Sequence, residues 1–181
     1  MKYLSEEIFM SASMPQFAQA IAKIQENAGP QFQSQPDYIF EDQSYPLFLS
    51  FASEQNKKTI IGTRSKQVVR SWEYCLVDTV PYVGERELQA YFALCQRLCA
   101  QLVQRDDPCH AFTYCSLIVL TEELDSAQRK ILKKFHEEID YRFTEGYGWS
   151  SLRIAVVDRK NRKIFTNSYG ADLKKRLTGL F

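Results

Sequence analysis

Hydrophobic residues recur at helical spacing in four stretches of the chain. Between residues 13 and 28 they fall on one face of a helix, which Ser13 would cap while Gln16 returns the hydrogen bond. The same spacing predicts helices over residues 85–105 and 125–143. In the latter, the apolar face would be formed by Ile131, Phe135, Ile139 and Phe143. A short last helix would carry Leu173, Leu177 and Leu180 on one side.

Between these stretches the pattern is typical of strands. Short strands with polar turns are predicted over residues 38–41, 45–51 and 58–62. Residues 112–120 form a nearly unbroken apolar run, which indicates a strand covered on both faces. Residues 152–157 and 163–166 flank a polar turn, so we expect a β-hairpin there.

Residues 67–77 fit two patterns. Alternation places Trp72, Tyr74 and Leu76 on one side of a strand, whereas Val68, Val69, Trp72 and Leu76 form one stripe of a helix. Because β-branched and aromatic residues dominate the segment, we favour the strand.

The order of elements predicts an α+β fold. We expect a single mixed, mainly antiparallel sheet, made of the N-terminal meander, the central buried strand and the C-terminal hairpin. Helices would pack mostly on one face of this sheet. Residues 112–157 have the order of a βαβ unit, in which the two strands would be parallel. Residues 1–181 would form one globular domain.

Composition favours a cytoplasmic protein. Hydrophobic residues make up 45% of the 181 residues, enough for a substantial core. No segment approaches the roughly 18 apolar residues of a membrane span, and Glu6 and Glu7 interrupt the N-terminal stretch where a signal peptide would be apolar. Five cysteines are an odd number, whereas a secreted disulfide framework usually pairs all of them.

Charge is distributed unevenly along the chain. Residues 1–124 carry ten basic and fifteen acidic side chains, and residues 125–181 carry thirteen and seven. An asymmetry of this kind indicates either a surface for an anionic partner or two sides of one domain. The candidate binding residues lie at the hairpin tip and on the last helix: Arg159, Lys160, Arg162, Lys163, Lys174 and Lys175. Aromatic residues that could stack on bases lie among them, although solvation explains the same charges.

Motifs for catalysis or cofactor binding are absent from the sequence. The glycines form neither a dinucleotide-binding nor a P-loop pattern, and the cysteines and histidines form no close-spaced metal pairs. We therefore expect no cofactor and no metal. Cys109 and His110 are adjacent, but neighbours on an extended segment point to opposite sides.

Three functional hypotheses follow. The first is a non-enzymatic binding or regulatory module that contacts a protein partner or a second copy of itself. It would use an aromatic meander that contains Phe32, Tyr38, Phe40, Tyr45, Phe48, Phe51, Trp72, Tyr74 and Tyr82. The second is binding of nucleic acid or an anionic ligand through the basic C-terminal surface. The third, which the absence of catalytic motifs disfavours, is an enzyme with a site near Cys109 and His110.

Overall fold

The computed structural model describes residues 15–57, 67–142 and 147–181. A 3-10 turn, Pro15–Phe17, leads into helix α1, Ala18–Ala28. The remaining elements are β1 (Gln33–Phe40), β2 (Gln43–Lys57), β3 (Gln67–Val83), α2 (Glu85–Leu102), β4 (His110–Leu124), α3 (Gln128–Lys134), β5 (Glu138–Arg142), β6 (Tyr147–Asp158), β7 (Lys163–Thr166), a 3-10 turn (Ser168–Asp172) and α4 (Leu173–Arg176).

The seven strands form one mixed sheet in the order β1-β2-β3-β4-β6-β5. Strand β7 pairs with the end of β6, beside β5 along the same edge. Strand β4 is parallel to both β3 and β6, whereas the other pairs are antiparallel. The predictions of an α+β class, a mainly antiparallel sheet and a parallel pair within residues 112–157 are therefore confirmed. The parallel pairing of β3 with β4, across α2, goes beyond the predicted meander.

Strand β4 lies at the centre of the sheet because both of its faces are apolar. Leu117 and Val119 pack into one hydrophobic core, while Ile118 and Leu120 pack into a second core on the opposite face. Side chains alternate across a strand, so a continuous apolar run can serve two cores at once.

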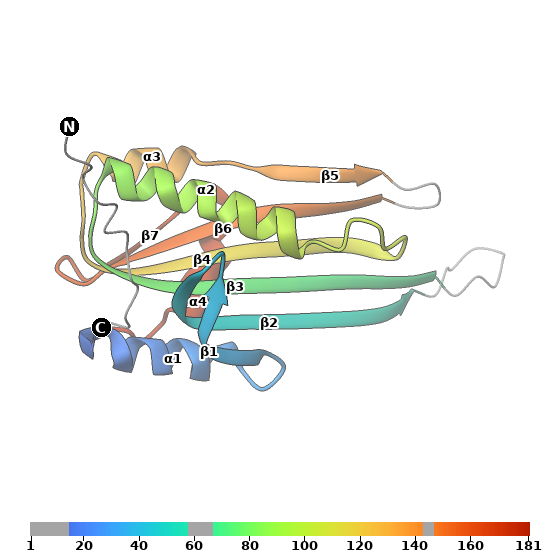
Figure 1. Cartoon of the computed structure of the whole chain (residues 1–181), viewed down its shortest axis with the longest axis horizontal. Helices are drawn as coiled ribbons and strands as arrows, with labels where there is room; N and C mark the ends of the chain where they lie inside the picture. Colours follow the sequence, from blue (N-terminus) through green and yellow to red (C-terminus); the bar gives the residue numbers. More distant parts are fainter. Residues whose placement is uncertain (1–14, 58–66, 143–146) are drawn as a thin grey trace.

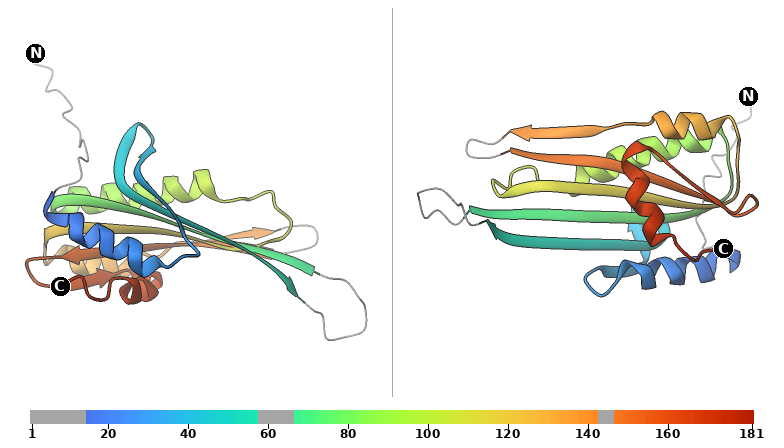
Figure 2. Two further views of the ribbon diagram at one scale, coloured as in Figure 1. Left: turned by 90° about the horizontal axis from the view of Figure 1, so that it is seen from below. Right: turned by 180° about the vertical axis from the view of Figure 1, so that it is seen from behind.

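Helices cover both faces of the sheet, rather than mostly one (Figures 1 and 2). Helices α2 and α3 pack on the face of the first core, which we call the α2 face. Helices α1 and α4 pack on the opposite face, which we call the α1 face. The sequence pattern shows which side of a helix is apolar but not which face of the sheet receives it.

The predicted helix over residues 125–143 requires correction. Helix α3 ends at Lys134, and residues 138–142 form the edge strand β5. Ile139 and Tyr141 alternate toward the α2 face with polar residues between them, so this segment satisfies the strand period as well as the helical one. Pairing with β6 decides between the two, because residues 138–142 form an antiparallel ladder with residues 147–151 of that strand.

The strand interpretation of residues 67–77 is confirmed, since these residues belong to β3. The first helix, the helix after residue 85 and the hairpin also occur where the pattern predicts them. The Ser13 cap, the strand over residues 58–62 and Phe143 lie outside the described residues. None of the described helices is long and apolar enough to cross a membrane.

Candidate functional site

The α1 face is covered by described helices over only part of its area. Figure 2 shows α1 and α4 over the half of this face where β4 and β6 end. The half where β4 and β6 begin carries no described helix, and we call it the open face. A sheet face without a covering layer normally carries polar side chains, so the residues found there are informative.

Three aromatic side chains stand together on the open face. Phe112 and Tyr114 are two apart on β4 and therefore point to the same side, and Trp149 lies directly opposite Phe112 on β6. The ring centroids are 5.1 Å apart for Phe112 and Tyr114, and 5.4 Å apart for Phe112 and Trp149. The Tyr114 and Trp149 rings meet edge to face at 5.5 Å. All three rings are half-buried, and we call them the aromatic cluster.

A buried group of charges borders the aromatic cluster. The Arg153 guanidinium lies 4.0 Å from the centre of the Tyr114 ring and donates hydrogen bonds to Ser116 Oγ and to Glu73 Oε1. Arg176 of α4 also donates to both carboxylate oxygens of Glu73, with 2.8 Å between Nη2 and Oε2. We call Glu73, Arg153 and Arg176 the ionic cluster. It marks the boundary at which α4 meets the open face.

An aromatic pair extends the surface beyond the ionic cluster. The Arg176 guanidinium lies 4.7 Å from the centre of the Phe32 ring, and the Phe32 ring lies 5.4 Å from that of Phe51. Both rings are half-buried. Aromatic rings thus lie on both sides of the ionic cluster, with the aromatic cluster next to Arg153 and the Phe32–Phe51 pair next to Arg176.

The six predicted binding cations lie in two groups, one at the β6–β7 turn and one on α4. Figure 2 shows the backbone of both elements. At the turn, Arg159 pairs with Glu122 at 2.8 Å and Lys160 pairs with Glu123 at 2.7 Å. Arg162 and Lys163 are exposed there. On α4, both lysines are exposed and Lys175 lies 3.5 Å from Asp172. Part of the cationic charge expected at this surface is therefore offset by carboxylates of the same chain.

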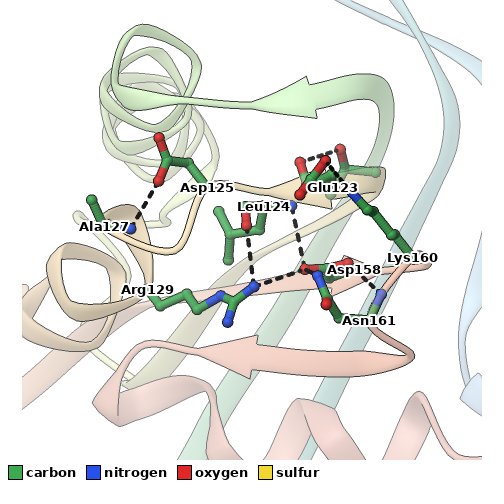
Figure 3. A network of polar contacts seen from close by, with 9 residues as sticks. Glu123, Leu124, Asp125, Ala127, Arg129, Asp158, Lys160 and Asn161 are labelled. Carbon is green, nitrogen blue, oxygen red and sulfur yellow. Dashed lines mark hydrogen bonds and ion pairs between the residues drawn. The ribbon is translucent and has the colours of Figure 1, made fainter.

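Asp158 organises the turn between β6 and β7 (Figure 3). Its carboxylate accepts hydrogen bonds from the Asn161 backbone at 2.9 Å and the Asn161 side chain at 2.8 Å. It also accepts a long bond from the Leu124 N–H and lies 3.6 Å from the Arg129 guanidinium. The Asp158 side chain is fully buried. These contacts join the ends of β4 and β6 and give Asp158 a structural role.

Cys109 and His110 make different contacts in the structure. His110 is buried on the α2 face, stacked on Trp72, with Nε2 2.8 Å from Thr113 Oγ1. Burial lowers the pKa of His110 below its usual value, which favours the neutral imidazole. The Cys109 N–H donates to Asp107 Oδ1 at 2.8 Å. Neither contact forms the thiol–imidazole pair that a cysteine nucleophile needs.

Three other thiols, those of Cys95 and Cys99 on α2 and of Cys115 on β4, lie in the core between this helix and the sheet. Cys99 Sγ lies 3.4 Å from Ser150 Oγ, and hydrogen bonding from the Cys115 thiol lowers the pKa of Cys99 to about 7. Cys95, Cys99 and Cys115 are all fully buried. A substrate would have to displace the core to reach them, so these thiols are packing residues. Within the described ranges, no three histidine, cysteine or acidic side chains gather in a group suited to a metal ion.

Sequence reasoning missed the ionic cluster and most of the aromatic cluster. Glu73, Arg153 and Arg176 come from three distant segments, so no local pattern unites them. The charge of Arg153 within an otherwise apolar strand is the one signal that marks a special position. A buried arginine requires a partner, but the sequence does not say which carboxylate supplies it.

Comparison with known proteins assigns the chain to a family. No curated protein and no solved structure matches the chain significantly. A family model described as "Domain of unknown function (DUF8052)" matches residues 17–179, a range that includes every described strand and all four α-helices. The chain therefore belongs to the family of domains of unknown function described as DUF8052.

Proposed function

We propose that this chain is a non-enzymatic module that binds a protein partner through the aromatic cluster on the open face. The observation that carries the proposal is the position of three half-buried aromatic rings on a half-sheet that no described helix covers. Burying rings of this size against a partner removes apolar surface from water and favours association.

The chemistry of the open face favours a protein surface over other partners. Aromatic side chains and arginine are the residue types enriched at the centres of protein interfaces. Two cavities of about 330 Å³ lie elsewhere in the described structure, and the side chains that line them do not include Phe112, Tyr114 or Trp149. Three neighbouring rings on one face of a sheet can pack together against the apolar side chains of a partner protein.

The electrostatics argue against nucleic acid at this site. Binding to phosphates requires cations that can replace counterions. The two arginines nearest the aromatic cluster, Arg153 and Arg176, already contact Glu73. We therefore propose a partner that presents apolar side chains.

Affinity purification with matched variants tests the proposal. Wild type, Trp149→Ala and the control Tyr82→Ala are immobilised and exposed to extract from the source cells. Tyr82 is 46% exposed and lies outside the open face, so its loss removes an aromatic ring without touching the aromatic cluster. Captured proteins are then purified, and their affinity for each variant is measured by titration calorimetry. Circular dichroism confirms that each variant is folded.

Central aromatic residues of an interface typically contribute at least about 2 kcal/mol, so Trp149→Ala should weaken the purified complex about thirtyfold. Tyr82→Ala should bind as wild type does. A second copy of this chain would also satisfy the proposal, if sedimentation shows a dimer that Trp149→Ala dissociates. Equal affinity of Trp149→Ala and wild type for every captured protein would refute it, as would retention of nucleic acid that depends on Trp149.

A further inference from the structure

We infer that a cavity at the ends of β4 and β6 binds a small amphipathic anion, with Arg159 and Arg162 holding its charged group. The cavity has a volume of about 330 Å³ and lies on the α1 face, away from the aromatic cluster. This volume is at the lower end of the range of about 300–1,000 Å³ that is typical of small-molecule sites. The inference is independent of the proposed protein-binding function.

The walls of the cavity are apolar because they continue the second core. Leu120 of β4 and Val157 of β6 point into this core, Phe17 packs on it ahead of α1, and Leu180 closes it from the C-terminal segment. Burial of an apolar body against such walls contributes roughly 25 cal/mol per Å² of surface removed from water. The ligand therefore needs an apolar portion.

Two arginines of the β6–β7 turn line the same cavity. The Arg159 N–H donates to the Thr121 carbonyl at 3.0 Å, and its guanidinium is held by Glu122 at 2.8 Å. Arg162 has a left-handed backbone, with φ of 49°, and its N–H donates to the Arg159 carbonyl at 3.1 Å. The turn thus positions both side chains with backbone contacts before any ligand binds.

The charge balance of the cavity favours an anion. Glu122 offsets the charge of Arg159, but no carboxylate of the described residues lies within ion-pair distance of the Arg162 guanidinium. A guanidinium presents paired donors that match the geometry of a carboxylate or a phosphate. An anionic head group beside an apolar body satisfies both halves of the cavity.

The left-handed backbone at Arg162 supports a functional reading of that residue. Residues with a side chain adopt this conformation at a cost, whereas glycine or asparagine does so readily. Arg162 occupies this position although glycine or asparagine would adopt the left-handed backbone at a lower cost in free energy. Contact between Arg162 and an anion in the cavity gives a physical reason for keeping it there.

Calorimetric titration of the full chain with octanoate and with octyl phosphate tests the inference. The two probes distinguish a carboxylate from a phosphate head group, and octan-1-ol supplies the same apolar body without charge. Three variants accompany wild type: Arg162→Asn, which suits the left-handed backbone, Arg159→Gln, and the control Lys163→Gln. Lys163 is an exposed cation of the same turn that does not line the cavity.

At least one of the two anions should bind wild type and Lys163→Gln with the same affinity. Loss of a charge-assisted hydrogen bond should weaken that binding about tenfold or more in Arg162→Asn and in Arg159→Gln. Octan-1-ol should bind at least about tenfold more weakly than the anion for the same reason. The inference is overturned if neither anion binds, if Arg162→Asn binds as wild type does, or if octan-1-ol binds equally well. Urea unfolding of each variant separates loss of binding from loss of fold.

Discussion

The ionic cluster allows a sharp prediction about stability, because its three members should not be equally important. Glu73 is the only acid among them and contacts both arginines. The side chains of Glu73 and Arg153 are 8% and 4% exposed, whereas that of Arg176 is 23% exposed. We therefore expect Glu73→Gln to destabilise the protein more than Arg153→Met.

The magnitudes follow from what each substitution leaves behind. Glu73→Gln leaves the buried Arg153 guanidinium without its carboxylate, and an uncompensated buried charge costs about 3–5 kcal/mol. Arg153→Met leaves Glu73 bonded through both oxygens to Arg176, so no charge is stranded. Its main penalty is the lost hydrogen bonding of the buried Ser116 hydroxyl, about 1–3 kcal/mol.

Urea unfolding measures both values. Fluorescence of Trp72 and Trp149 follows the transition, and the free energy of unfolding comes from the midpoint and slope. Since domains are typically stable by about 5–15 kcal/mol, Glu73→Gln should remain folded without urea. Its unfolding midpoint should lie at a much lower urea concentration than that of wild type. The double variant Glu73→Gln/Arg153→Met removes the stranded charge, so it should recover part of the loss.

Two results would refute this reasoning. One is a free energy of unfolding for Glu73→Gln within about 1 kcal/mol of wild type, which would mean that Arg153 is adequately solvated without its carboxylate. The other is an equal loss in Arg153→Met and Glu73→Gln. In that case packing against Tyr114, rather than charge compensation, would set the energetics.

Three further predictions concern other parts of the molecule. Because burial lowers the pKa of His110 below 6.5, the unfolded chain takes up a proton first, so the free energy of unfolding should fall as pH decreases from about 7 to 5.5. His110→Phe should flatten this dependence; a slope unchanged in His110→Phe would contradict the assignment. Cys109 is half-buried while the other thiols are buried, so Ellman's reagent should rapidly label one thiol in the native protein and none in Cys109→Ser; rapid labelling of a second thiol would show that the core is open. Asp158→Ala should cost about 3–5 kcal/mol in urea unfolding, because it strands the Asn161 and Leu124 donors and leaves Arg129 without its carboxylate; a loss below about 1 kcal/mol would show that water replaces the carboxylate.

Local patterns predicted most elements of the fold. Apolar residues recur at helical spacing after residue 85, and they form a nearly unbroken run in β4. In both segments the local repeat of apolar residues is enough to predict the element. The prediction failed at residues 138–142, where the apolar period fits both a helix and a strand. Pairing with β6 settled that segment, and pairing is a property of the folded sheet.

The order and spacing of apolar residues along the chain were enough to predict the α+β class and the burial of β4 on both faces. Which face of the sheet each helix covers, and therefore which part of a face has no described helix over it, became known from the folded structure. The tertiary structure also brought Glu73 to Arg153 and Arg176, which are 80 and 103 positions further along the chain. The physical reason is that periodicity records the burial of single residues, whereas a site depends on contacts between strands whose order and register are fixed only when the sheet assembles.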